Sequence, residues 1–281
     1  MQNARVFKGI GRIATGLTLF LAIGCSGAAQ PPVSTPGPAV SVTVAPDDLG
    51  TLWTTTRTAV YRSRDGGDTW RRVAGAPGGT SASFARKRMV LVGGGAAWTG
   101  SFAGVGLRPM ASPPTNLVAV SSPFYQTNRL YALDSGGALW VSVTGGRTWS
   151  PVRARGLPAG AIAISARRAA TDDPDWIFVA AGPAGLWRSH DFGASFRRLP
   201  GIADATAVAT TPHDATRVLV AGPAGLWLST DNGAGFRKVL DRRGITAIAL
   251  DTRNWKNGYA TLRDGRMLRS DDGGDTWGVP R

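Results

Sequence analysis

A short motif of the form S-x-D-x-G-x-T-W recurs along this chain at intervals of about forty residues. Its copies take their first position at Ser63, Gly100, Ser142, Ser189, Ser229 and Ser270. The copy at Gly100 is eroded, and it emerges when the segment from Ala97 is aligned without gaps on the segment from Leu186. Successive starts lie 37, 42, 47, 40 and 41 residues apart, which indicates one structural unit repeated six times.

Each unit has the same internal order of short apolar runs. A first run such as V-S-V-T-V or A-I-A-I precedes a polar loop and a second run such as L-Y-A-L or V-L-V-A. A Gly-rich turn then leads to a third run such as L-W-V-S, which ends at the motif, and a short fourth run begins at the aromatic residue. This pattern predicts an all-β fold, a single β-propeller of about six four-stranded blades over residues 39–281, although a seventh, irregular blade stays possible.

The motif resembles the Asp-box, or bacterial neuraminidase repeat, which connects the third and fourth strands of propeller blades. This repeat occurs in sialidases, in the sortilin ectodomain, in xyloglucanase-type glycoside hydrolases and in photosystem II assembly and stability factors. The last of these are the most similar in size and plan, with one arginine-rich propeller after an export signal. Because these families do unrelated things, the resemblance implies a fold and leaves the function open.

The residues that recur in the motif are those that build a turn. The third-position carboxylate can accept hydrogen bonds from its own backbone, the fifth-position glycine can adopt positive φ, and the aromatic residue can be buried. A site-forming residue would instead occur only where the site is. We therefore interpret the motif as structural, with a calcium loop as the alternative for the two copies richest in aspartate. The predicted turn residues are Ser63, Asp65, Gly67, Trp70, Asp191, Gly193, Asp231, Gly233, Ser270, Asp272, Gly274 and Trp277.

The N-terminus has the form of an export signal. Three basic residues precede the apolar segment 13–23, which is too short to span a bilayer and ends in L-A-I-G-C. This ending resembles the bacterial lipoprotein signal, which implies cleavage before Cys25 and attachment of lipid to it. We expect a signal peptide at 1–24, a lipidated cysteine with a flexible tether at 25–38, and a protein anchored by lipid at the bacterial cell envelope. An ordinary signal peptide is the alternative.

Catalytic chemistry has little support in the sequence. All 18 acidic residues are aspartates, so the tyrosine–glutamate pair of sialidases cannot be formed. A two-aspartate hydrolase of the xyloglucanase type stays possible, and its candidate acids are Asp134, Asp172, Asp173, Asp175, Asp241 and Asp264. The two histidines are isolated, and no phosphate-binding or nucleophile motif is present. We expect no cofactor, no metal and no catalytic residue.

The formal net charge of +14 comes mostly from arginine. Arginines that follow the motif's aromatic residue are expected on outermost strands, where charge discourages edge-to-edge pairing. A second set is expected in loops on the face opposite the motif turns, where it would form an anion- or partner-binding seam between the last and first blades; exposed loops without a site are the alternative. This set is Arg57, Arg242, Arg243, Arg263 and Arg266.

These observations favour a protein-binding or assembly module with protein partners in the cell envelope. Contact with the membrane is expected only through the N-terminal lipid, and no specific nucleic-acid binding is expected. The alternatives are the two-aspartate hydrolase and nonspecific binding of anionic polymers or headgroups by an arginine-rich surface.

Cys25 is expected to be the acylated N-terminal residue of the mature protein. Intact-mass and peptide mass spectrometry of protein purified from membranes should show cleavage before Cys25 and a lipid on its sulfur. An unmodified cysteine, or cleavage at another bond, would contradict the lipoprotein interpretation.

Overall fold

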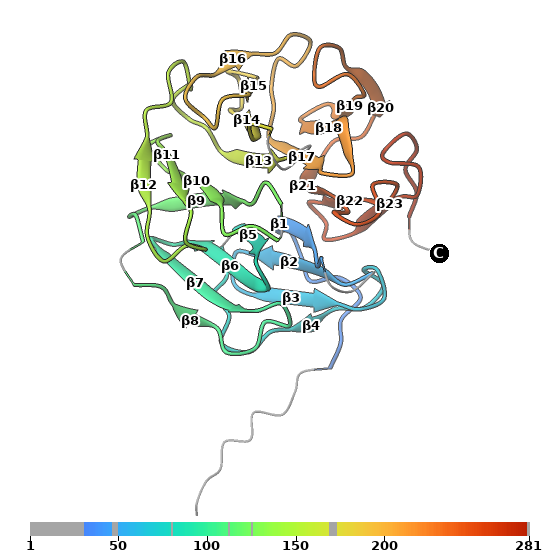
Figure 1. Cartoon of the computed structure of the whole chain (residues 1–281). Helices are drawn as coiled ribbons and strands as arrows, with labels where there is room; N and C mark the ends of the chain where they lie inside the picture. The colour runs from blue at the N-terminus through green and yellow to red at the C-terminus, as the bar shows by residue number, and fades with distance from the viewer. Residues whose placement is uncertain are drawn as a thin grey trace, which may run out of the picture. The chain divides into compact units, whose positions relative to one another are not determined.

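The computed structural model describes residues 31–46, 50–79, 81–111, 113–124, 126–168 and 173–279. The predicted signal peptide and Cys25 lie outside these residues. The described part of the chain is all-β, with no helix, and so contains no helix that could cross a membrane. The β-sheets are arranged around a centre as a propeller of six blades, which confirms the predicted fold (Figure 1).

Each blade is an antiparallel sheet built from consecutive strands. Blade 1 holds β1 (Ala39–Val44), β2 (Leu52–Thr56), β3 (Val60–Ser63) and β4 (Arg71–Arg72). Blade 2 holds β5 (Ser81–Ala85), β6 (Arg88–Gly93), β7 (Ala96–Ser101) and β8 (Arg108–Pro109). Blade 3 holds β9 (Leu117–Ser121), β10 (Leu130–Asp134), β11 (Leu139–Ser142) and β12 (Ser150–Val152).

The second half of the ring follows the same plan. Blade 4 holds β13 (Ala163–Arg167), β14 (Trp176–Ala180), β15 (Leu186–Ser189) and β16 (Arg197–Arg198). Blade 5 holds β17 (Ala207–Thr211), β18 (Asp214–Gly222), β19 (Gly225–Ser229) and β20 (Arg237–Leu240). Blade 6 holds β21 (Ile245–Leu250), β22 (Gly258–Leu262) and β23 (Met267–Ser270), and an isolated bridge between Arg269 and Gly278 takes the place of its fourth strand.

The second strand of each blade is buried on both faces. All five residues of β2 are buried, and the same is true of β22, because neighbouring blades cover both sides of each sheet. The described residues contain one hydrophobic cluster between each pair of neighbouring blades. The cluster between blades 6 and 1 joins Val42, Leu52 and Trp70 to Tyr259 and Met267, and it closes the ring.

The segment before blade 1 also contacts the propeller. Val33 exchanges two backbone hydrogen bonds with Trp70, of 2.9 Å and 2.8 Å, at the outer side of blade 1. Gly37 lies against Gly265, where an added Cβ would come within 2.9 Å of the Gly37 Cα. The last residues of the range expected to form a tether therefore lie against blades 1 and 6.

The innermost strands present hydroxyl groups to one another. Because an innermost strand has no further partner strand, half of its backbone groups need other hydrogen-bond partners. Ser165 Oγ of blade 4 accepts a hydrogen bond of 3.0 Å from Thr210 N of blade 5. Ser121 of blade 3 accepts one of 2.9 Å from Ala166 N of blade 4. These side chains thereby link successive blades around the centre.

Replacement of Ser165 by alanine should lower stability because it leaves the buried Thr210 N–H without its acceptor. The expected cost is about 1–3 kcal/mol in the free energy of unfolding. Urea denaturation followed by tryptophan fluorescence measures this cost, with the exposed Ser150→Ala of β12 as control. Equal denaturation midpoints for the two variants would show that the inner hydroxyl contributes nothing.

Candidate functional site

The motif turns are closed by a repeated set of hydrogen bonds. In blade 1, Ser63 Oγ donates to Asp65 Oδ1 at 2.7 Å and accepts from Gly67 N at 2.7 Å. Asp65 also accepts from Thr69 N at 2.9 Å and from the Thr69 hydroxyl. Trp70 Nε1 donates to the Gly67 carbonyl at 3.0 Å. Each polar group of the motif thus has a partner inside its own turn.

The contacts of the motif serine recur in blades 4, 5 and 6. The serine-to-aspartate bond measures 2.7 Å from Ser189 to Asp191, 2.6 Å from Ser229 to Asp231 and 2.7 Å from Ser270 to Asp272. The glycine N–H donates to the serine from Gly193, Gly233 and Gly274, and Trp277 Nε1 donates to the Gly274 carbonyl.

Fifth-position glycines are required for two separate reasons. Gly193 has φ of +90° and Gly67 has φ of +100°, a region that side chains other than glycine rarely adopt. In addition, a Cβ on Gly193 would lie 2.6 Å from Leu139 of blade 3, and one on Gly67 would lie 2.6 Å from Met267 of blade 6. The turn of each of these blades therefore packs closely against the preceding blade.

The turn hydrogen bonds lower the aspartate pKa values. Desolvation raises the pKa of Asp65, but hydrogen bonds from Thr69 and Ser63 outweigh it and bring the pKa down to about 2. In Asp272, desolvation is likewise outweighed by hydrogen bonds from Thr276 and Ser270, so the pKa is lowered. Stability from such groups is present above pH 3.8, the ordinary pKa, and is lost as pH falls below it.

Blades 2 and 3 carry altered motifs. In blade 3, Thr144 stands at the aspartate position, and its hydroxyl accepts a hydrogen bond of 2.9 Å from Thr148 N. Gly146 N still donates to Ser142 Oγ at 2.8 Å. In blade 2, Gly100 stands at the serine position, and Ser101 Oγ accepts from Val105 N at 3.2 Å. Both turns keep their place in the fold without the motif's carboxylate.

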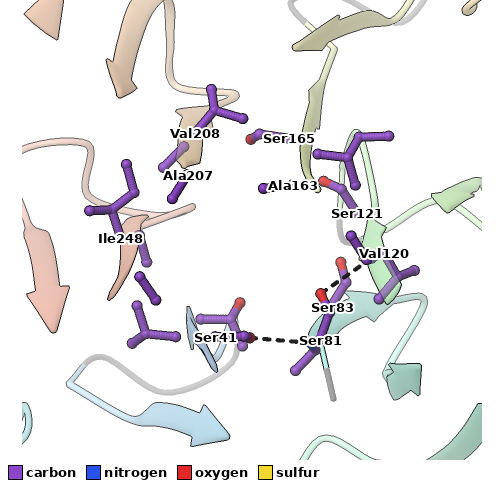
Figure 2. Close-up of a pocket in the computed structure, with 18 of the residues that line it drawn as sticks. Ser41, Ser81, Ser83, Val120, Ser121, Ala163, Ser165, Ala207, Val208 and Ile248 are labelled. Carbon is purple, nitrogen blue, oxygen red and sulfur yellow. Dashed lines mark hydrogen bonds between the residues drawn. The ribbon is translucent and has the colours of Figure 1, made fainter. Parts of the chain in front are cut away.

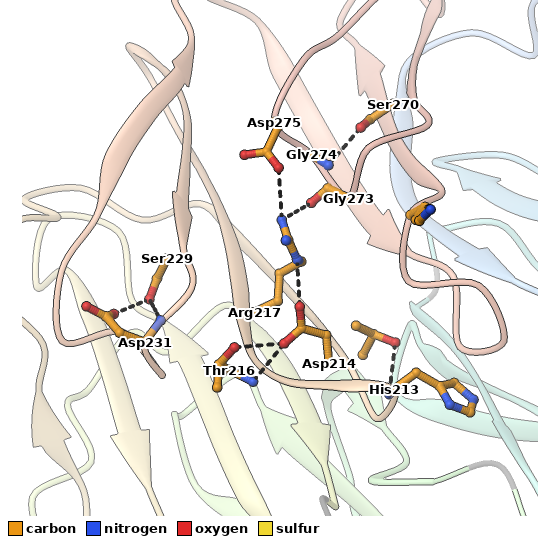
Figure 3. A network of polar contacts seen from close by, with 12 residues as sticks. His213, Asp214, Thr216, Arg217, Ser229, Asp231, Ser270, Gly273, Gly274 and Asp275 are labelled. Carbon is orange, nitrogen blue, oxygen red and sulfur yellow. Dashed lines mark hydrogen bonds and ion pairs between the residues drawn. The ribbon is translucent and has the colours of Figure 1, made fainter.

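Arginines connect some turns to the preceding blade. Arg217 of β18 donates from Nε to Asp214 at 3.0 Å and from a terminal nitrogen to the Gly273 carbonyl at 2.8 Å (Figure 3). It also forms an ion pair of 3.5 Å with Asp275, at the sixth position of the blade 6 motif. Arg269 of blade 6 contacts Asp68, at the same position in blade 1, at 2.9 Å. The aspartates at the sixth motif position therefore form ion pairs between neighbouring blades.

A buried ionic cluster lies between blades 3 and 4. The Asp175 side chain is fully buried, and it pairs with Arg168 Nε at 2.6 Å and with Arg129 at 3.3 Å. The Tyr131 hydroxyl donates to the same carboxylate at 2.8 Å. Burial and the charge of Asp175 raise the pKa of Tyr131 above its usual range. The carboxylate is fully engaged and shielded from solvent, which leaves it poorly placed for contact with a substrate.

Arg167 is a buried cation at the seam between blades 4 and 5. Its side chain lies over the rings of Trp176 and Phe178, at 5.4 Å and 5.6 Å from their centroids. One terminal nitrogen donates to Asn232 Oδ1, while Nε and the other terminal nitrogen have no hydrogen-bond partner among the residues that the structure describes. Burial lowers the pKa of Arg167 to about 10, and the charge of Asp214 opposes this change. Sequence reasoning did not single out this residue, because nothing in its strand marks it as buried.

A narrow cavity runs along the centre of the propeller. It has a volume of about 220 Å³ and is lined by the six innermost strands. Ser41, Ser81, Ser83, Ser121 and Ser165 bring hydroxyl groups to it among small apolar side chains (Figure 2). The serines already accept backbone hydrogen bonds between blades. The described residues that line this cavity include no ionisable side chain.

The predicted arginine set is divided in the structure. Arg242, Arg243 and Arg263 line one shallow hollow together with Asp264, between the β20–β21 connection and the β22–β23 turn. Arg266 is beside this hollow and is paired with Asp264 at 2.7 Å. Arg57 lies in the β2–β3 turn, where its carbonyl faces Gly79 in the connection to blade 2, and it does not line the hollow.

The carboxylates beside this hollow are already paired. Asp241 forms an ion pair of 2.6 Å with Lys238, which lowers the pKa of Asp241, and Arg243 adds to this effect. Hydrogen bonds from Arg266 lower the pKa of Asp264, with a smaller contribution from the charge of Arg242. Among the described residues, no group of three or more potential His, Cys or Asp ligands could hold a metal ion.

The proteins similar to this chain agree on the fold but differ from one another in function. No family model matches the chain. A xyloglucanase from Paenibacillus sp. is 29% identical over 165 residues, which cover 52% of this chain and only 15% of that protein. A GH74 enzyme from Niastella koreensis superposes with a TM-score of 0.58 at 18% identity, over 83% of this chain and 36% of that one.

Two solved structures of YCF48 match over most of their length. YCF48 from Cyanidioschyzon merolae superposes with a TM-score of 0.54 at 20% identity, over 90% of this chain and 88% of that one. A structure of YCF48 bound to D1 peptide gives a TM-score of 0.56 at 15% identity, over 89% and 83% of the two chains. At these identities the likeness concerns the β-propeller fold alone.

The two neighbouring aspartates of the last motif form a matched test of the turn. Asp272→Ala should reduce the free energy of unfolding by about 1–3 kcal/mol at neutral pH, because the turn N–H and hydroxyl groups lose their acceptor. Asp271→Ala, at an exposed position of the same turn, is the control and should change little. The Asp272 deficit should shrink as pH falls below 3.8, because the carboxylate of the unfolded chain then begins to be protonated while the native one, whose pKa is lowered, stays ionised to lower pH. A deficit that does not vary with pH would exclude the charged carboxylate as its cause.

Proposed function

We propose that this protein is an exported, lipid-anchored propeller of the bacterial cell envelope that binds a protein partner and performs no catalysis. In this proposal the partner contacts the hollow formed by Arg242, Arg243 and Arg263. The observation that carries it is the gathering of three arginines at an open surface whose nearest carboxylates are already paired with other cations. Guanidinium groups suit bidentate recognition of carboxylates on a partner.

The arrangement of the aspartates supports a non-catalytic role. A glycosidase of this type needs a carboxylic acid with a raised pKa beside a second carboxylate. The pKa is instead lowered in Asp65, Asp191, Asp214, Asp231, Asp241, Asp264 and Asp272. Of the remaining candidates, Asp134 accepts hydrogen bonds from Gly136 N and from Trp140 Nε1, and Asp175 is buried in its ion pairs. Asp173 is exposed, and Asp172 lies outside the described residues.

The shared fold with YCF48 also supports a binding role. One of those structures is of YCF48 bound to D1 peptide, and it superposes on 89% of this chain. A protein with this fold can therefore bind a peptide. The identity of that peptide does not indicate which partner the present protein binds.

Charge reversal in the hollow should weaken partner capture. Tagged full-length protein carrying Arg243→Glu and Arg263→Glu should recover less of its partner from the envelope fraction, with the largest difference at low salt. The control carries Arg197→Glu and Arg198→Glu on the exposed edge strand β16, which makes the same change in net charge. Equal recovery by both variants, with melting temperatures like the parent, would contradict a role for the hollow.

The xyloglucanase similarity gives a second candidate function, a two-aspartate glycoside hydrolase. Incubation of the purified chain with xyloglucan, followed by reducing-sugar assay, tests it directly. Release of sugars that is lost in an Asp134→Asn or Asp264→Asn variant would favour the hydrolase. If the purified chain instead captures several unrelated anionic polymers to the same extent, nonspecific electrostatic binding would be favoured.

A further inference from the structure

A second basic hollow lies on the face that carries the motif turns, between blades 2 and 3. It has a volume of about 480 Å³. Arg86, Lys87 and Arg88 line it from the β5–β6 hairpin, and Arg147 lines it from the motif turn of blade 3. No acidic residue is among its lining residues, and none of these four cations forms an ion pair with any residue that the structure describes.

Two of these cations occupy positions that form an ion pair elsewhere in the ring. In β6, Met89 pairs with Gly100, the first motif position of blade 2, and Arg88 directly precedes Met89. In β18, Val218 pairs with Ser229, the first motif position of blade 5, and Arg217 directly precedes Val218. Arg147 takes the sixth position of the motif, which Asp275 takes in blade 6. Between blades 5 and 6 these positions form the Arg217–Asp275 pair of 3.5 Å. Between blades 2 and 3 both positions are arginine, so the seam lacks its counter-charge.

The motif turn of blade 3 has also lost its other carboxylate. Thr144 stands where blades 1, 4, 5 and 6 have the turn aspartate. The Thr144 carbonyl accepts a hydrogen bond of 3.2 Å from Arg147 Nε, which fixes the base of that guanidinium and leaves its terminal nitrogens for another acceptor. The substitution therefore removes negative charge from the side of the hollow.

The hairpin that supplies the other three cations has an unusual backbone. Arg86 and Lys87 form the two-residue turn between β5 and β6, with φ of +39° and +65°. Turns with two positive φ values favour Asn-Gly and similar pairs, and side chains as long as arginine and lysine are rare there. Backbone conformations of this kind are often found at functional sites. Here the strained turn holds three consecutive cations at the seam.

We propose that this hollow binds a phosphate group, carried either by a small phosphate ester or by a lipid headgroup. The group would lie between Arg88 and Arg147 and supply the charge that Asp275 supplies between blades 5 and 6. Arginine forks bind phosphate oxygens in a bidentate manner. Four cations without a carboxylate favour a multiply charged anion over a single carboxylate. This site is on the opposite face from the arginine hollow assigned to the protein partner.

Calorimetric titration of the detergent-solubilised full chain with inorganic pyrophosphate tests the site. Chloride buffer of equal ionic strength excludes general screening of charge. Arg147→Asp recreates the residue pair of the blade 5–6 seam, so we expect it to fold with an unchanged or higher melting temperature in chloride. It should bind pyrophosphate at least about tenfold more weakly, since it loses charged hydrogen bonds. Arg197→Asp on β16 makes the same charge change away from the hollow and should bind as the parent does.

Two further probes distinguish the sources of the phosphate group. Monomeric short-chain phosphatidylglycerol is titrated beside glycerol 3-phosphate, with short-chain phosphatidylcholine as the zwitterionic control. Binding of the lipid that exceeds binding of glycerol 3-phosphate, and that is lost in Arg147→Asp, identifies a headgroup; the reverse order identifies a free ester. Absence of binding by pyrophosphate and by both probes, or an equal loss in Arg197→Asp, overturns the proposal. Retained partner capture by Arg147→Asp separates this site from the proposed function.

Discussion

The structure depends on covering both faces of every blade with apolar side chains. A blade whose second strand is buried throughout, as β2 and β22 are, is not stable alone in water, because both faces of its sheet need an apolar neighbour. Stacking around a ring satisfies this condition for all six blades once Leu52 and Tyr259 meet in the cluster between the last and first. The fold therefore requires closure, and the loops and turns are free to vary only at the two ends of this packed cylinder.

Polar groups at the two ends are constrained by the same closure. The glycine of a motif turn lies directly against the preceding blade, so the turn is a contact between blades as well as a connection within one. Arg217 and Arg269 use that proximity to reach the next turn. Where the sequence lacks one half of such a contact, as at Arg147, the unmatched half, Arg88, is exposed at a seam. Seams are consequently the places where a structural contact of this scaffold can become a binding site.

The repeat period and the short apolar runs were sufficient to predict the propeller, because its blades follow from local periodicity. Contacts between blades were not predictable in the same way. Arg217 of blade 5 reaches Asp275 of blade 6, and Arg129 of blade 3 reaches Asp175 of blade 4, at heights that depend on how the blades stack. The arginine hollow was only partly anticipated, since Arg242 and Arg263 meet across one loop pair whereas Arg57 belongs to a turn facing blade 2. The burial of Arg167 has no signature in its own strand.

Each hydrogen-bonded sheet is formed by strands that are consecutive in the chain, and none of the described strands of the first blade pairs with one of the last. Blades can therefore acquire their backbone pairing one after another during synthesis, with only short loops to close. The seam between blades 6 and 1 is different, because the contacts of Arg269 with Asp65 and Asp68 join residues 204 and 201 positions apart. Until blade 6 has been synthesised, the apolar flank of blade 1 stays uncovered. The nascent chain thus exposes this apolar surface from the synthesis of blade 1 until the synthesis of blade 6. This architecture therefore requires that the surface be shielded during folding.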